Sequence, residues 1–292
     1  PRVAYDHRQQ RDTFMTPRPD DPLHTIPHFA LQDGRRLAFS AGLNIVCVGG
    51  ALAVGAVLLT RIMPAGGYAY FYKTLGAYLL ILLPLLGFLH AHRPHTRFGP
   101  ANTVTLIRAA MVCLLASLCG ERWYDIRLPI VYGERWNTFE LLVAGVAILA
   151  LTLDGVDGWL ARLRGTQSRF GARFDMETDA LLVLVLSVLA WQSGRAGAWV
   201  MIAGSMRYGF IVLTLLRPWL NRPLPESMRR KTVCVLQLIA LIACVAPILP
   251  DAWRAAAAVG AVVMVTASFA IDLDWLIRQR RSPLPQAPNA AC

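Results

Sequence analysis

Apolar segments of bilayer length follow one another along most of this 292-residue chain. A transmembrane helix needs roughly 17–25 apolar residues, because every backbone polar group must find its hydrogen bond inside the segment. The chain is 55% hydrophobic and only 16% charged, whereas soluble domains carry about 25% charged residues. The sequence therefore predicts an all-α, polytopic membrane helix bundle, with spans near 38–61, 68–91, 103–120, 137–153, 178–193, 197–216, 232–250 and 255–277.

The positive charges predict how these spans are oriented. Loops and termini on the side of the N-terminus carry 20 Lys and Arg residues, against 6 on the opposite side. Positively charged loops remain in the cytoplasm, so we expect a multi-pass cell-membrane protein with both termini and residues 154–179 on the cytoplasmic face. Because these loops account for the net charge of +11, nucleic-acid binding is not predicted.

Two pairs of aspartates lie at the ends of two apolar helices that follow one another in the sequence. Asp154 and Asp157 are spaced i,i+3 at the end of one predicted helix, and Asp175 and Asp179 are spaced i,i+4 at the start of the next. Each spacing places both members of a pair on one helix face. Carboxylates at the edge of a bilayer repel one another and resist desolvation, so the site requires cations. Four carboxylates without His or Cys favour two ions such as Mg²⁺, Mn²⁺ or Ca²⁺.

The residues between the aspartates are small or polar. Ala161 shares the face of the first pair, and Gly158 beside it leaves room for a ligand to approach the backbone. Arg162 follows one turn after Gly158 and is placed to pair with a phosphate oxygen. Pairing of the aspartates with nearby arginines alone is the other interpretation, but it does not require four carboxylates at helical spacing.

The segment resembles the signature of the CDP-alcohol phosphotransferases, membrane enzymes of phospholipid synthesis. The family pattern D-x2-D-G-x2-A-R-x8-G-x3-D-x3-D is matched at every fixed position: Asp154, Asp157, Gly158, Ala161, Arg162, Gly171, Asp175 and Asp179. Residues 100–108 are also similar to the family's Asn-x-x-Thr-x-x-Arg segment, with Asn102, Thr105 and Arg108 at the fixed positions. The resemblance covers about 100–277 and implies a six-helix core preceded by two further transmembrane helices.

The resemblance also implies roles for individual residues. All four aspartates are expected to bind two divalent cations, Mg²⁺ or Mn²⁺, and Asp179 is expected to act as the general base. An alcohol hydroxyl would attack the phosphorus next to the lipid alcohol of CDP-diacylglycerol or a similar CDP-linked donor, releasing CMP. The expected donor-binding residues are Asn102, Thr105, Gly158, Ala161, Arg162, Ser168 and Gly171.

The expected organisation has four parts. Residues 1–36 form a polar arm that is disordered or lies on the membrane surface, and 37–99 hold the two additional helices. Residues 100–277 form the family core, and 278–292 form a disordered tail. No cleavable signal peptide is expected, because the polar arm precedes the first apolar span. The sequence leaves the acceptor open among glycerol phosphate, inositol phosphate, serine and another phospholipid. It also leaves the oligomeric state open, and a homodimer is compatible with it.

Basic residues outside the signature have two interpretations each. Arg207, inside an apolar span, binds an acceptor phosphate or pairs with an aspartate of the site. Residues 229–231 (Arg-Arg-Lys) bind a phosphorylated acceptor or lipid head groups, or act as a positive-inside anchor, which is the favoured interpretation. Gln237 is a ligand or an interhelical hydrogen-bond donor. The histidines His90, His92 and His95 are expected in an interfacial loop.

Other functions fit the sequence less well. Phosphatidylglycerophosphate synthases usually have Lys after the last aspartate, where this chain has Ala180, which disfavours glycerol 3-phosphate as acceptor. An intramembrane prenyltransferase would carry a second Asp-rich motif, and only Asp272 and Asp274 resemble one. A divalent-metal transporter would need carboxylates near the middle of several spans, whereas here they gather at one edge.

Overall fold

The computed structural model describes residues 28–62, 68–92, 95–121, 138–220, 224–225 and 227–281. Within these residues the chain forms eight α-helices and no strand, which confirms the predicted all-α bundle. Three short 3-10 helices lie at helix ends. The elements are α1 (His28–Ile62), α2 (Ala69–Phe88), η1 (Leu89–His92), α3 (Pro100–Ser117), α4 (Thr138–Leu163), α5 (Arg169–Gln192), η3 (Ala198–Val200), α6 (Met201–Leu216), η4 (Pro218–Leu220), α7 (Met228–Val245) and α8 (Asp251–Arg281).

The first and last helices are longer than the predicted spans. α1 begins at His28, so residues 28–36, expected in the polar arm, are helical. α8 continues to Arg281, beyond the predicted end at 277. Adding a residue to an existing helix gains one hydrogen bond without the cost of nucleation, so polar flanks readily extend an apolar helix. Residues 1–27 and 282–292 of the expected arm and tail lie outside the described residues.

Six helices of the described chain are long and apolar enough to cross a membrane, namely α1, α2, α3, α4, α6 and α8. The predicted spans in α5 and α7 are less apolar, because α5 carries the second aspartate pair and α7 begins with Arg229, Arg230 and Lys231. α5 packs against α3, α6 and α7, and α7 packs against α4, α5 and α8. These helices therefore have protein neighbours on several sides and need less apolar surface than a lipid-facing helix.

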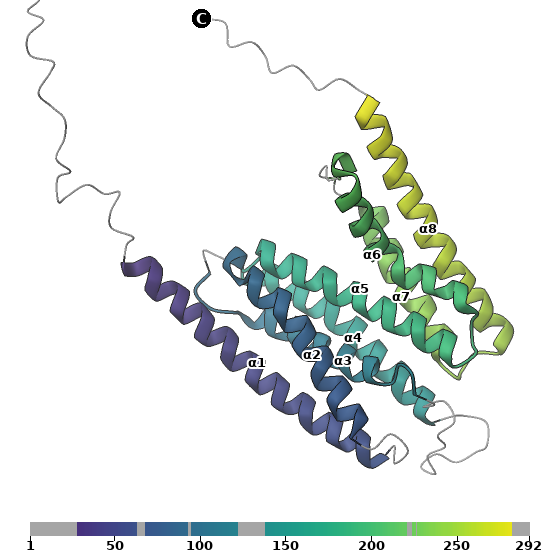
Figure 1. Ribbon diagram of the computed structural model, residues 1–292, viewed down its shortest axis with the longest axis horizontal. Coiled ribbons are helices and arrows are strands. Elements are labelled where there is room, and N and C mark those ends of the chain that lie inside the picture. The colour runs from purple at the N-terminus through teal and green to yellow at the C-terminus, as the bar shows by residue number, and fades with distance from the viewer. Residues whose placement is uncertain are drawn as a thin grey trace, which may run out of the picture.

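The helices are arranged around α3, α4 and α5. Figure 1 shows α1 and α2 on one side of these helices and α6, α7 and α8 on the other. α3 contacts α1, α2, α4 and α5, and its residues Leu106, Ala109 and Cys113 are completely buried. Ala147 and Ala150 of α4 are also completely buried. Small side chains of this kind let two helix backbones approach closely, which brings the start of α3 next to the end of α4.

Two apolar clusters fix α5 along its length. Its first turns contribute Phe170 and Phe174 to a cluster that includes Tyr78 and Leu82 of α2. Its later turns contribute residues such as Leu186 to a larger cluster shared with α3, α4, α7 and α8. Since the aspartates of α5 lie between these two anchored regions, their position relative to α4 is fixed by packing on both sides.

The contact between α5 and α6 depends on Gly204. A Cβ atom added there would lie 2.7 Å from the Cα of Leu184 and 3.1 Å from Oγ of Ser187. The first of these neighbours is backbone and cannot move without shifting the whole helix. Any side chain at position 204 would therefore push α6 away from α5.

We predict that Gly204→Ala destabilises the protein by about 1–3 kcal/mol, the usual cost of overpacking a close contact. The measurement is the thermal unfolding midpoint of the protein purified in detergent. Gly209→Ala is the matched control, because it lies in the same helix and a Cβ there would meet nothing within 4 Å. Equal midpoints for both variants would contradict the close contact.

Candidate functional site

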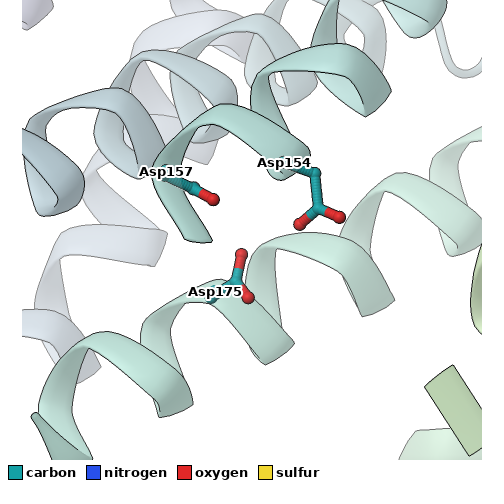
Figure 2. A group of neighbouring side chains, drawn as sticks. All are labelled: Asp154, Asp157 and Asp175. Atoms are coloured by element: carbon teal, nitrogen blue, oxygen red, sulfur yellow. The ribbon is translucent and has the colours of Figure 1, made fainter. Parts of the chain in front are cut away.

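Three aspartates from two helices converge on one point. Asp154 and Asp157 project from α4 toward Asp175 on α5, as Figure 2 shows. One carboxylate oxygen from each lies within 4.8 Å of the other two. The geometry follows from the sequence, because α4 continues without interruption to Leu163 and so places the i,i+3 pair on one face.

Arg108 of α3 lies against all four aspartates of the signature. Its Nη1 is 2.8 Å from Asp157 Oδ2 and 2.5 Å from Asp175 Oδ1. Its Nη2 is 2.9 Å from Asp154 Oδ1 and also bonds Asp179 Oδ1. Nε donates to the carbonyl oxygen of Ala150 in α4. The side chain is only 1% exposed, so one buried guanidinium ties α3, α4 and α5 together by ionic hydrogen bonds.

The charge of this cluster favours cations. Four carboxylates face one guanidinium, which leaves a formal excess of negative charge in an apolar setting. The oxygens of Asp154, Asp157 and Asp175 are close enough to share a metal ion, and carboxylate oxygens suit Mg²⁺ or Mn²⁺. The residues present thus fit a divalent cation. Asp179, expected as a fourth ligand, is not part of this three-residue set.

A polar cavity of about 370 Å³ opens on one side of the aspartates. Asp157 and Asp175 lie in its wall, and Lys231 reaches it from α7. Thr105 has a second role, because its Oγ1 donates to Asp157 Oδ2 at 2.8 Å. All seven residues expected to bind the donor line this cavity: Asn102, Thr105, Gly158, Ala161, Arg162, Ser168 and Gly171.

The turn between α4 and α5 closes the polar cavity. Gly165 has φ of +60°, a conformation that side chains disfavour. Ser168 is the N-cap of α5, and its Oγ accepts a hydrogen bond from the Gly171 amide at 3.0 Å. A Cβ at Gly171 would lie 2.9 Å from Oδ1 of Asn102. A side chain at position 171 would therefore require the Asn102 side chain to shift.

A second cavity, of about 480 Å³, lies between α5, α6, α7 and α8. Asp179 lines this cavity, whereas Asp157 and Asp175 line the polar cavity described above. Gln237 also lines it and donates to the carbonyl oxygen of Ala203 at 3.1 Å, so it is an interhelical hydrogen-bond donor. The aspartate cluster thus forms the partition between two cavities.

Three arginines outside the signature, Arg207, Arg229 and Arg230, form ion pairs that the sequence did not predict. Arg207 bonds Glu177, with Nη2 2.6 Å from Oε1, and not an aspartate of the site. Arg229 and Arg230 both pair with Asp272 of α8. These ion pairs join α7 to α8.

The histidine segment also contacts the site. His92 is buried, and its Nδ1 lies 2.8 Å from Ser168 Oγ. His95 Nε2 lies 3.4 Å from the carbonyl oxygen of Gln167, while the side chain of His90 lies outside the described residues. Both described histidines therefore support the turn between α4 and α5, and are not merely part of an interfacial loop.

Sequence reasoning placed Arg108 in a family motif but gave it no role. The sequence did indicate a role for Arg108, because a single arginine inside an apolar span is energetically costly and usually marks a functional site. The partners Glu177 and Asp272, and the contribution of Lys231, depend on which helices become neighbours. No local pattern in the sequence could have revealed them.

The comparison with known families agrees with this geometry. The family described as CDP-alcohol phosphatidyltransferase matches residues 100–270. Since that match covers more than half of the chain, the protein belongs to the CDP-alcohol phosphatidyltransferase family. Comparison with curated proteins and with solved structures gives no match.

We predict that Arg108→Gln lowers the stability of the protein and makes it depend on divalent cations. Removing one partner of a buried ionic group costs about 3–5 kcal/mol, and a divalent cation would replace part of the lost charge. The measurement is the thermal unfolding midpoint in detergent with EDTA and with Mg²⁺. The midpoint of the variant should rise more on adding Mg²⁺ than that of the unmodified protein, and an equal rise would contradict the prediction.

Proposed function

We propose that this protein transfers a phosphatidyl or related phospho-alcohol group from CDP-diacylglycerol, or a similar CDP-linked donor, to an alcohol, with release of CMP. The proposal rests on one observation: the aspartate cluster lies between two cavities, with Asp157 and Asp175 lining one and Asp179 lining the other. A transferase of this kind must bring two different substrates to one phosphorus atom, and the partition offers each substrate a separate approach. Family membership supports the same reaction class.

The polar cavity suits the CDP moiety of the donor. Arg162 and Lys231 supply positive charge in its wall, and Asn102 and Gln167 supply amide groups. Thr166 also lines it, and its Oγ1 is buried with no hydrogen-bond partner among the described residues. A polar ligand would satisfy that hydroxyl, since unpaired buried polar groups are costly.

The aspartates at the partition fit divalent cations, Mg²⁺ or Mn²⁺. Bound there, these ions would neutralise the diphosphate and stabilise the departing CMP. Asp154, Asp157 and Asp175 would hold them, Thr105 fixes Asp157 by its hydrogen bond, and Arg108 keeps the carboxylates in place.

Asp179 faces the second cavity and is suited to act as the base. Only its Oδ1 bonds Arg108, which leaves Oδ2 to accept a hydrogen bond from an acceptor hydroxyl. As the hydroxyl oxygen forms its bond to phosphorus, the hydroxyl proton passes to this carboxylate. The phosphoanhydride bond to CMP breaks in the same transfer, and its electron pair leaves with the CMP oxygen.

The direct test is CMP release by the purified protein. The assay contains CDP-diacylglycerol in mixed micelles, Mg²⁺ or Mn²⁺, and a panel of alcohols that includes glycerol, glycerol 3-phosphate, inositol, inositol phosphate, serine and a phospholipid. We expect CMP to form only when metal and a suitable alcohol are both present. Formation that is unaffected by EDTA would contradict the role of the aspartates.

We predict that Asp157→Asn and Asp175→Asn abolish CMP release, because each removes a carboxylate at the partition. Asp179→Asn should lower kcat by about 10²–10⁴-fold at every pH, as expected for loss of a general base. Asp274→Asn is the matched control, since Asp274 pairs with Arg278 on the exposed surface of α8. Near-normal turnover in the Asp179 variant would remove it as the base.

The alternative functions receive less support. Asp272 and Asp274, the candidate second Asp-rich motif of a prenyltransferase, both pair with arginines of the protein. A transporter would require carboxylates along a path through the bundle, whereas those of the signature gather around Arg108. We also propose that the site faces the cytoplasm, where CDP-linked donors are made, as the loop charges indicate.

A further inference from the structure

The second cavity, bounded by α5–α8, contains arginines that are already engaged. Arg207 and Arg230 line it, together with Asp179 and Asp272. Arg207 binds Glu177 through two nitrogens, with Nη2 2.6 Å from Oε1 and Nε 3.4 Å from Oε2. This two-point pairing occupies one of the two donor pairs with which the guanidinium could bind a phosphate.

The pairing at Arg230 has the same consequence. Its Nη1 lies 3.3 Å from Asp272 Oδ1, and its Nη2 bonds the carbonyl oxygen of Pro225. The neighbouring Arg229 is paired as well, because Nη2 bonds Asp272 and Nη1 bonds Ser268. Asp272 is only 7% exposed, so its negative charge is fixed in the wall of the cavity.

A phosphorylated acceptor would fit this cavity poorly. A phosphomonoester carries a charge of about −1.5 to −2 at pH 7. It would lie near Asp179 and Asp272 and would compete with the carboxylates already paired with Arg207 and Arg230. An alcohol without phosphate needs only hydrogen bonds, and the polar groups of the cavity wall can supply them.

We propose that the acceptor of this enzyme is an alcohol that carries no phosphate group. The proposal rests on the function proposed above, since it names the substrate class of the same reaction. Glu177 and Asp272 act as selectivity residues, because each holds an arginine that would otherwise bind the phosphate of a competing acceptor.

The first test measures kcat/KM for CMP release with matched acceptor pairs, namely glycerol against glycerol 3-phosphate and inositol against inositol 1-phosphate, with serine added. The best acceptor should be unphosphorylated and should exceed every phosphorylated member by about tenfold or more, the value of one charge-assisted hydrogen bond. A phosphorylated best acceptor overturns this inference and leaves the transferase function standing. No CMP with any acceptor would overturn the transferase function and the inference together.

The second test releases Arg207 by Glu177→Gln. This substitution keeps the size of the side chain but removes its charge, so the use of phosphorylated acceptors relative to unphosphorylated ones should rise about tenfold. Asp274→Asn, on the exposed surface of α8, should leave the ratio unchanged. An unchanged ratio in the Glu177 variant would show that the ion pair does not select the acceptor.

A separate observation concerns the segment before the family match. His92, in η1, is 1% exposed and lies between two partners. Its Nε2 is 3.0 Å from the carbonyl oxygen of Arg97, which can only accept a hydrogen bond, so Nε2 carries a proton. Burial lowers the pKa of His92 and is the largest effect. The bond to the Arg97 carbonyl raises this pKa, and the neighbouring His95 lowers it, each by less than burial does. The ring is therefore neutral at neutral pH.

This protonation determines the direction of the Ser168 hydroxyl. Nδ1 of the neutral ring has a lone pair, so Ser168 donates its proton to His92 at 2.8 Å. The serine oxygen then has lone pairs for the Gly171 amide and for the polar cavity that Ser168 lines. We infer that His92 is a positioning residue for the CDP-linked donor, supplied by the helices that precede the family core.

The test is a double-mutant cycle of His92 and Ser168, in which KM and kcat for CDP-diacylglycerol are measured. His92→Ala should raise the KM for CDP-diacylglycerol about two- to tenfold, the value of one hydrogen bond, with kcat nearly unchanged. In the Ser168→Ala background the same change should have no further effect. His92→Asn, whose side-chain oxygen can accept from Ser168, should restore most of the affinity. Additive effects of the two alanine substitutions, or a fall in kcat alone, would overturn the inference.

Discussion

The contact of one buried guanidinium with four carboxylates is the interaction on which this structure depends. Arg108 is inside an apolar helix, where an isolated charge is expensive, and the aspartates would repel one another without it. Neither component is stable in this environment alone, and together they still leave excess negative charge. The arrangement therefore combines a structural role, joining α3, α4 and α5, with an affinity for cations.

The same contact separates the two cavities. Asp157 and Asp175 line one cavity and Asp179 lines the other, so the helices that Arg108 joins also determine which carboxylate lines which cavity. One further bond on each side of this contact holds a charged side chain in place. Thr105 holds Asp157 on the polar side, and Glu177 holds Arg207 on the other.

Features with a local cause could be predicted from the sequence. The helical faces of the aspartate pairs follow from their spacing, and the seven residues expected around the donor do line one cavity. The partners of Arg207, Arg229 and Arg230 could not be predicted, because they depend on the packing of α5, α7 and α8 across long sequence separations. The start of α1 was placed ten residues too late, since polar flanking residues look alike in a helix and in an unstructured arm.

The apolar cluster at the start of α5 extends across residue 100, where the family match begins. Tyr78 and Leu82 precede that point and pack in one cluster with Phe170 and Phe174, which follow the signature turn. The family match begins at residue 100, whereas the apolar packing continues across this point. The two additional helices pack in the same apolar cluster as the family core, and a protein cut at residue 100 would expose the apolar surface that Tyr78 and Leu82 cover.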